Sequence, residues 1–325
     1  MRWSSGSVPP ARDALRLAGG LAAALALTAG VPAAADLAFV TCQNGDALSV
    51  VDTAARAEIA RWDVPGKPAG VAAGPGAVYT VSPDDKTVRR WSLSGALGAA
   101  RALDGGPIGI ALDAGRGRVF VSDWYNARAW VLDADTLALT GELTTRAAPS
   151  GLALSADGAW LAIAERDADR VSLFDAQTLA RVHAVAVGSR PFGLGFAPDG
   201  RLFVGNVGSN DVTVIDPASG EVIATVPVQD HPYGVAFAAG RAFVTNQYAG
   251  TLSVISLDDL SAVATLPAGE YPEGIAATSD GQIAVANWFD NTLHLIDAAS
   301  LQTVAQIDTA DGPRAFGAFV LDTGR

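Results

Sequence analysis

The sequence predicts an all-β fold: a seven-bladed β-propeller with four antiparallel strands in each blade. Three observations predict it, namely a repeat of about 40 residues, four strand patterns within each repeat, and partial repeats at the two ends that complement each other. The chain has 325 residues, of which 50% are hydrophobic, 17% are charged and 35 are Gly. This composition suits many short buried strands joined by tight turns within one large domain.

The repeat is marked by Pro-x-Gly followed by a large aliphatic residue. Its six clear copies begin at Pro68, Pro107, Pro149, Pro191, Pro232 and Pro272, and their glycines lie 39, 42, 42, 41 and 40 residues apart. A seventh, looser copy runs from Gly312 to Gly317. Because proline favours an extended conformation in the residue before it, we expect each copy to open the innermost strand of a blade.

Four apolar runs bounded by turn residues follow one another in each repeat. In the copy that begins at Pro191, the inner run ends at the Pro198–Gly200 turn, and Leu202–Asn206, Val212–Asp216 and Val222–Val228 follow. Runs of this length with period 2, or apolar throughout, are strand patterns. The third run ends in Asp in five blades, at Asp52, Asp133, Asp175, Asp216 and Asp297. We expect these carboxylates to bind backbone amides in the next turn.

The two ends of the chain complement each other. Leu37–Val40 and Leu48–Asp52 have the pattern of second and third strands, with no first strand before them. Phe316–Leu321 has the pattern of a first strand with nothing after it. We therefore expect the N- and C-terminal strands to complete one shared blade, which closes the ring and leaves no open sheet edge.

Residues 1–35 have the pattern of an export signal. Three arginines precede the apolar run Leu21–Val31, which is shorter than the ~20 residues that a membrane span needs. Small residues before Asp36 predict cleavage after Ala35. We expect residues 36–325 to form a single propeller domain, periplasmic or secreted and without membrane insertion after cleavage. A retained membrane anchor is the alternative.

Charge and cysteine content limit the classes of partner and of covalent cross-link that this protein can have. Removing residues 1–35 takes away three Arg and one Asp, so the formal net charge changes from −12 to −14. A protein this acidic repels polyanions, which argues against nucleic acid as a partner. Cys42 is the only cysteine, so no internal disulfide is possible. The sequence has no haem-attachment, P-loop, nucleophile-elbow or zinc-protease motif, and it predicts a monomer with no cofactor and no metal.

The second strands carry a family resemblance. The runs Phe39–Thr41, Val78–Val81, Phe243–Asn246 and Ile283–Asn287, each followed by a strand similar to Val-Ser-Val-Ile-Asp, resemble the YVTN-repeat β-propellers. The resemblance covers essentially the whole mature chain and implies a seven-bladed, usually exported protein. Similar propellers serve as binding modules, surface proteins, large subunits of amine dehydrogenases, and lactonase-like or lyase-like enzymes, so the resemblance implies little about activity.

A functional site is expected on one face of the ring. That face should hold the loops at Pro-x-Gly and the loops between second and third strands, whereas the other face should hold tight turns that serve as scaffold. The candidate ligand-binding residues around a central mouth are Asp123, Trp124, Tyr125, Arg166, Arg190, Phe192, His231, Tyr233, Tyr248, Tyr271, Glu273, Trp288 and Arg314. Aromatic walls with a few convergent polar groups are typical of a ligand pocket. An ordinary propeller rim is the alternative.

Three functions are consistent with this pattern. The leading one is an exported binding or scaffold module that takes an unknown small molecule or periplasmic protein at the mouth. The first alternative is a lactonase-like or lyase-like enzyme, with His231 and Glu273 as catalytic acid and base and Arg190 and Arg314 as anion-binding groups. The second is a subunit of a periplasmic redox complex whose acidic surface steers a basic electron carrier.

Overall fold

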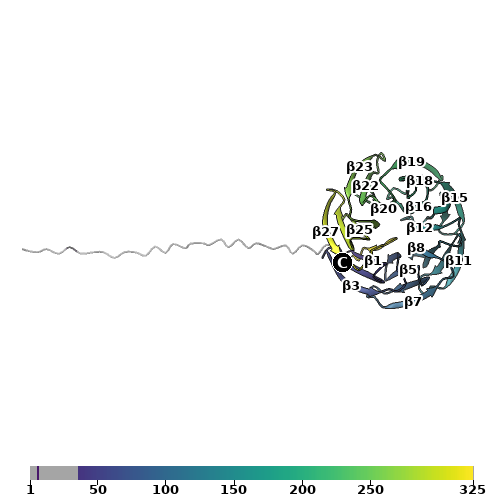
Figure 1. Cartoon of the computed structure of the whole chain (residues 1–325), viewed down its shortest axis with the longest axis horizontal. Helices are drawn as coiled ribbons and strands as arrows, with labels where there is room; N and C mark the ends of the chain where they lie inside the picture. The colour runs from purple at the N-terminus through teal and green to yellow at the C-terminus, as the bar shows by residue number, and fades with distance from the viewer. Residues whose placement is uncertain (1–5, 7–35, 325) are drawn as a thin grey trace, which may run out of the picture. The chain divides into compact units, whose positions relative to one another are not determined.

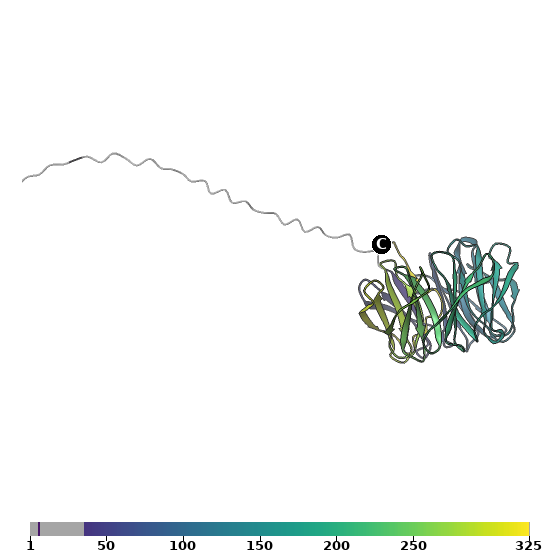
Figure 2. The same cartoon turned by 90° about the horizontal axis from the view of Figure 1, so that it is seen from above.

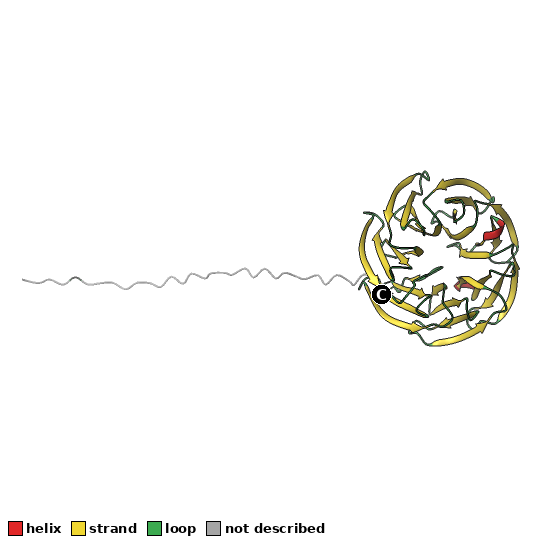
Figure 3. Ribbon diagram, in the orientation of Figure 1, coloured by secondary structure: helices red, strands yellow, loops and turns green. Residues whose placement is uncertain are grey.

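Seven four-stranded antiparallel sheets surround a central axis in the computed structural model, which describes Gly6 and residues 36–324 (Figure 1). The predicted fold class is confirmed. Apart from Gly6, the predicted signal peptide lies outside the described residues. Strands dominate, and the two helices of the described part are short 3-10 turns, η1 (Ala114–Arg116) and η2 (Arg166–Ala168) (Figure 3). Neither these nor any other helix within residues 36–324 is long and apolar enough to cross a membrane.

Six blades are each built from four consecutive strands, the first innermost and the fourth at the perimeter (Figure 1). The first three of these blades are β4 (Gly70–Gly74), β5 (Ala77–Ser82), β6 (Thr87–Trp91) and β7 (Leu97–Ala102); β8 (Pro107–Asp113), β9 (Arg118–Asp123), β10 (Arg128–Asp133) and β11 (Leu139–Thr144); and β12 (Pro149–Leu154), β13 (Trp160–Glu165), β14 (Arg170–Asp175) and β15 (Arg181–Ala186). The next three are β16 (Pro191–Phe196), β17 (Leu202–Asn206), β18 (Asp211–Asp216) and β19 (Glu221–Pro227); β20 (Pro232–Ala238), β21 (Arg241–Asn246), β22 (Thr251–Ser256) and β23 (Ala262–Pro267); and β24 (Pro272–Ala277), β25 (Gln282–Asn287), β26 (Thr292–Asp297) and β27 (Gln302–Asp308).

The core lies between neighbouring blades. Second and third strands are buried on both faces because each is packed between two blades, whereas the outer fourth strands are mostly exposed. A phenylalanine near the start of the second strand is fully buried in four blades, at Phe39, Phe120, Phe203 and Phe243. The strands run between the two faces of the ring (Figure 2). These faces therefore consist of the turns and loops that join the strands.

The predicted contacts of the third-strand carboxylates are confirmed. Asp52 accepts a hydrogen bond from the Ala55 amide at 2.8 Å, and Asp297 accepts one from the Ser300 amide at 2.7 Å. The same contact recurs in the blades of Asp133, Asp175 and Asp216. These carboxylates are turn-forming elements of the scaffold.

The seventh blade is formed by both ends of the chain, as predicted, but its inner strand is shorter than expected. It consists of β28 (Val320–Leu321), β1 (Leu37–Cys42), β2 (Ala47–Asp52) and β3 (Ala57–Asp63), in that order. Residues 316–318 instead run parallel to β4 of the adjacent blade, where Val71 and Ala73 donate to the carbonyls of Phe316 and Ala318 at 3.0 and 2.7 Å. The predicted strand is thus divided between two blades, because the inner edge of β4 offers unpaired backbone groups along its path.

The conformation before the repeated proline also differs from expectation. Arg190, His231 and Tyr271 have φ values of 54°, 58° and 60°, in the left-handed region rather than extended. Hydrogen bonds from the preceding blade hold two of them there: the Arg190 amide donates to Asp169 at 2.7 Å, and the His231 amide donates to Asn210 at 3.0 Å. These contacts outweigh the local preference of a residue before proline.

Cys42 ends the second strand of the shared blade and is fully buried beside Ser49. Burial raises the pKa of its thiol to about 11, from an ordinary value of 9.0. Between these two pH values the unfolded chain loses the proton while the folded chain keeps it, so folding stability falls as the pH rises. We expect the wild-type protein to lose about 2 kcal/mol relative to a Cys42→Ala variant between pH 9 and 11.

Urea titrations of both proteins at intervals of half a pH unit would measure this difference. The variant carries every other titrating group, so the difference between the two curves isolates Cys42. A pH-independent difference would contradict the buried, protonated thiol.

Candidate functional site

Two faces of the ring must be distinguished. The loop face carries the Pro-x-Gly entries and the loops between second and third strands, such as 206–211. The turn face carries the turns between first and second strands, such as 197–201, and those between third and fourth strands. All thirteen candidate residues come from segments of the loop face.

The predicted mouth on the loop face is filled by side chains. Phe192, Tyr233 and Phe316 form an aromatic plug, with ring centroids 4.5 Å apart for Phe192–Tyr233, 5.0 Å for Phe192–Phe316 and 5.6 Å for Tyr233–Phe316. All three are buried, and Trp124 and Ile108 pack against them. Phe192 and Tyr233 therefore pack across the axis instead of lining an open entrance.

A buried ion pair lies beside the plug. Arg314 Nε is 3.1 Å from Glu273 Oε2, and Gln247 donates to Glu273 Oε1 at 2.6 Å. Arg314 also donates to the Tyr233 hydroxyl at 2.8 Å and to Gln43 Oε1 at 3.0 Å. The Glu273 side chain is only 1% exposed. The polar side chains here are thus engaged mainly with one another.

The pKa values of this group follow from its burial. Burial raises the pKa of Glu273, while Arg314 and Gln247 act in the opposite direction. Burial also opposes the charge on Arg314, but Glu273 and Tyr233 offset this and raise its pKa above the ordinary value. Burial likewise raises the pKa of Tyr233. Because the charge on each partner depends on the other, loss of either would leave an uncompensated group in the interior.

The most exposed part of the site is a set of rings from consecutive blades, which we call the aromatic row: His231, Tyr248, Tyr271, Trp288 and Phe289. His231 stacks on Tyr248 with centroids 3.6 Å apart, Tyr248 lies 5.5 Å from Tyr271, and Tyr271 lies 5.0 Å from Phe289. Trp288 stacks on Phe289 at 5.4 Å. The side chains of Tyr248 and Phe289 are 56% and 62% exposed.

Contacts within the aromatic row, and with Arg314 beside it, hold the rings and the tyrosine hydroxyl groups in place. Burial and the hydrogen bond with Tyr248 raise the pKa of Tyr271 to about 12. The Arg314 guanidinium lies 5.9 Å from the Trp288 ring and 5.9 Å from the Tyr233 ring, so it joins the row to the plug. The structure thus brings together nine predicted residues: Trp124, Phe192, His231, Tyr233, Tyr248, Tyr271, Glu273, Trp288 and Arg314.

The four remaining candidates, Asp123, Tyr125, Arg166 and Arg190, lie at the margin of this group or apart from it. Asp123 is fully buried and accepts from the Gly106 amide at 2.8 Å and from Arg128 at 2.9 Å. Arg166 lies over the Trp124 ring at 5.5 Å and pairs with Asp167. Tyr125 is 73% exposed, and the Arg190 residue is exposed. No contact among residues 36–324 joins His231 to Glu273, the proposed acid and base.

Two glutamines complete the buried group, Gln43 and Gln247. Both directly follow a second strand, as Trp124, Arg166 and Trp288 do. Aligning that one position across the repeats would have found Gln43 from sequence. In the part of the chain that the structure describes, no cluster of three or more His, Cys, Asp or Glu side chains could hold a metal ion.

Comparison with known proteins supports the fold alone. No protein-family model matches the chain, and no curated protein sequence matches it. Hydrazine synthase from Kuenenia stuttgartiensis superimposes with a TM-score of 0.72 at 18% identity, covering 80% of this chain and 91% of that one. A catalytically inactive variant of virginiamycin B lyase from Staphylococcus aureus, solved with quinupristin, gives a TM-score of 0.66 at 16% identity, covering 78% and 92%.

Proposed function

We propose that this protein is an exported binding propeller that docks a partner protein through the aromatic row on its loop face. The observation that supports the proposal is the cluster of five ring side chains from consecutive blades, two of them more than half exposed. Exposed clusters of large apolar side chains mark interaction sites. Tyr, Trp and Arg are the residues that dominate binding energy at protein interfaces.

The closed mouth favours a protein over a small molecule at this face. A small ligand needs a concave pocket, but the plug fills the axis here, and Glu273 beside the plug is already paired with Arg314. Exposed carboxylates flank the row at Asp230, Glu270 and Asp290. The partner should therefore present a basic rim around an apolar centre, and its association rate should fall as salt is added.

The test compares the wild-type protein with a Tyr248→Ser/Phe289→Ser variant. A protein co-purified from cell-envelope extract by the wild type, once identified, should bind the variant at least about tenfold more weakly in calorimetry, because the exposed rings supply the apolar contact area. Tyr125→Ser is the matched control, since it removes an even more exposed ring from the same face outside the row, and it should leave affinity unchanged. Equal affinity of all three proteins for the partner would contradict the proposal.

Acid–base catalysis at His231 is a second candidate. Its Nδ1 lies 2.9 Å from Asp230 Oδ1, and a carboxylate in this position orients an imidazole for proton transfer. Glu273 is too deeply buried to be its partner at the surface, so the dyad is Asp230–His231. A lactone or lyase activity that depends on it should fall about 100-fold or more in His231→Ala. Full activity in that variant would remove His231 from any mechanism.

A further inference from the structure

The turn face holds a cavity that the sequence did not indicate. It lies along the axis, has a volume of about 560 Å³ and is lined by β8, β12, β16, β20, β24 and residues 316–318. Its closed end is formed by Tyr233 and Phe316 of the plug. Burial is high near the plug and falls toward Leu154, Phe196 and Ala318, so the cavity opens on the turn face.

Close packing of the blades explains why the cavity narrows at the plug. A Cβ atom added at Gly193 would lie 1.9 Å from the Tyr233 carbonyl oxygen, and one at Gly151 would lie 2.4 Å from the Phe192 carbonyl oxygen. No side chain fits between the inner strands at that level. Farther along the same strands, Leu154, Phe196 and Phe237 are accommodated and line the wider part.

The walls combine apolar side chains with free backbone groups. Ile110, Leu152, Leu194, Val235 and Ile275 line the cavity along with the glycines. The innermost strands β8, β12, β16, β20 and β24 have a strand neighbour on one side only, so part of their N–H and C=O groups face the axis. A ligand in the cavity would contact apolar side chains on most sides and could form a few hydrogen bonds with backbone N–H and C=O groups.

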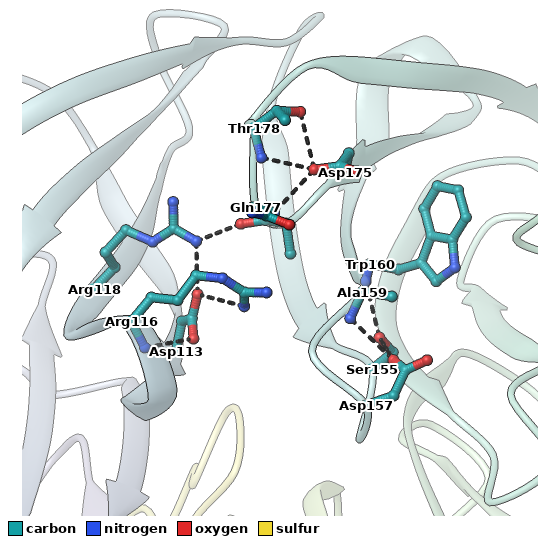
Figure 4. A network of polar contacts seen from close by, with 11 residues as sticks. Asp113, Arg116, Arg118, Ser155, Asp157, Ala159, Trp160, Asp175, Gln177 and Thr178 are labelled. Atoms are coloured by element: carbon teal, nitrogen blue, oxygen red, sulfur yellow. Dashed lines mark hydrogen bonds and ion pairs between the residues drawn. The ribbon is translucent and has the colours of Figure 1, made fainter.

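The charged groups on the two turns beside the opening already have polar partners. Asp113 accepts from Arg116 at 3.3 Å and from Arg118 at 2.8 Å, and Ser155 donates to Asp157 on the adjacent turn at 2.6 Å (Figure 4). A second hollow, of about 510 Å³, lies between these two turns and shares Leu112, Leu154 and Ala156 with the cavity. Glu273 is the only charged residue that lines the axial cavity in the described part of the chain, and it is paired with Arg314.

We propose that this axial cavity is a second binding site, and that it takes an uncharged small molecule with a predominantly hydrocarbon body. The volume lies within the range of small-molecule sites, about 300–1,000 Å³. A charged ligand would lose its hydration without gaining a free counter-charge, which is costly in an apolar site. The site lies on the face opposite the aromatic row and is independent of the function proposed there.

The full-length mature protein can be titrated with the neutral probe N-phenyl-1-naphthylamine, whose fluorescence rises in apolar surroundings. We expect saturable binding of one probe per chain. The anionic analogue 8-anilino-1-naphthalenesulfonate should bind at least about tenfold more weakly, because its sulfonate has no partner. Absence of saturable binding of the neutral probe, or equal affinity for both probes, would overturn the proposal.

Variants locate the site. Ala318→Trp places a large ring at the opening and should weaken binding of the neutral probe at least about tenfold, whereas Ala318→Ser should preserve it. Ala156→Trp, on an exposed turn beside the cavity, gives the same test if the first variant misfolds. Tyr248→Ser/Phe289→Ser should bind the probe as the wild type does. Unchanged affinity in both tryptophan variants, or lost affinity in the aromatic-row variant, would contradict this location.

Discussion

Replacing Arg314 with methionine is expected to destabilise the propeller by about 3–5 kcal/mol at pH 7.5, one of the largest effects of any single substitution in this chain. The change leaves the Glu273 carboxylate in the interior with only Gln247 as a hydrogen-bond partner. It also removes the hydrogen bonds to Tyr233 and Gln43. Guanidinium chloride unfolding would measure the loss.

The pH dependence of this loss identifies its cause. Without Arg314 the pKa of Glu273 rises further, so the carboxyl binds a proton as the pH falls and the burial penalty shrinks. We expect a clearly smaller destabilisation at pH 5 than at pH 7.5. Glu273→Gln/Arg314→Met, which removes both charges, should recover at least half of the lost stability at pH 7.5.

Arg190→Met is the matched control for Arg314→Met. It removes the same charge from the same face, but at an exposed position, so the expected change is within about 0.5 kcal/mol. An Arg314→Met variant that loses less than about 1 kcal/mol at both pH values would show that the ion pair contributes little to folding.

Truncation after Gly312 is expected to abolish the cooperative fold. It removes β28, the fully buried Phe319 and the plug residue Phe316. Loss of each phenylalanine side chain costs about 3–5 kcal/mol, and a domain of this kind is stable by only about 5–15 kcal/mol. The truncation also exposes the inner edge of β1, whose free backbone groups can pair with other chains.

Circular dichroism and size-exclusion chromatography would show this as a broad thermal transition and aggregated material. Removing only residues 324–325 is the control and should leave the transition unchanged. A synthetic peptide of residues 313–325, added in excess, should restore a sharp transition because it supplies the missing strand. A truncated protein that stays monomeric and melts as the wild type does would refute the closing role of the tail.

The sequence was sufficient to predict the blades because each one is defined locally. The Pro-x-Gly copies, and the Asp that ends the third strand in five blades, recur with the period of the fold, and the structure places them at the inner strands and the following turns as expected. The path of residues 316–318 could not be predicted, because it depends on the free edge of β4, which is distant in sequence. The conformation of Arg190 and His231 was missed for the same reason: loop side chains of the preceding blade determine it.

The site was predicted in part. Nine candidates do come together on the loop face, since the repeat aligns their positions in successive blades. The contact of Phe192, Tyr233 and Phe316 at the axis could not be predicted, because ring packing depends on side-chain rotamers from three segments distant in sequence. The axial cavity was missed because the tight turns around its opening have the pattern of simple scaffold.

The shared blade also determines when this protein can finish folding. The Ala315 amide donates to the Thr41 hydroxyl across 274 positions of the chain, so the first strands cannot be completed until the last residues have been made. At about 5–20 residues per second, synthesis leaves β1 without its inner neighbour for tens of seconds. Contacts between residues this far apart in sequence also slow the closure of the ring itself. Throughout that interval the inner edge of β1 stays unpaired, and the ring can close only when residues 315–321 reach it.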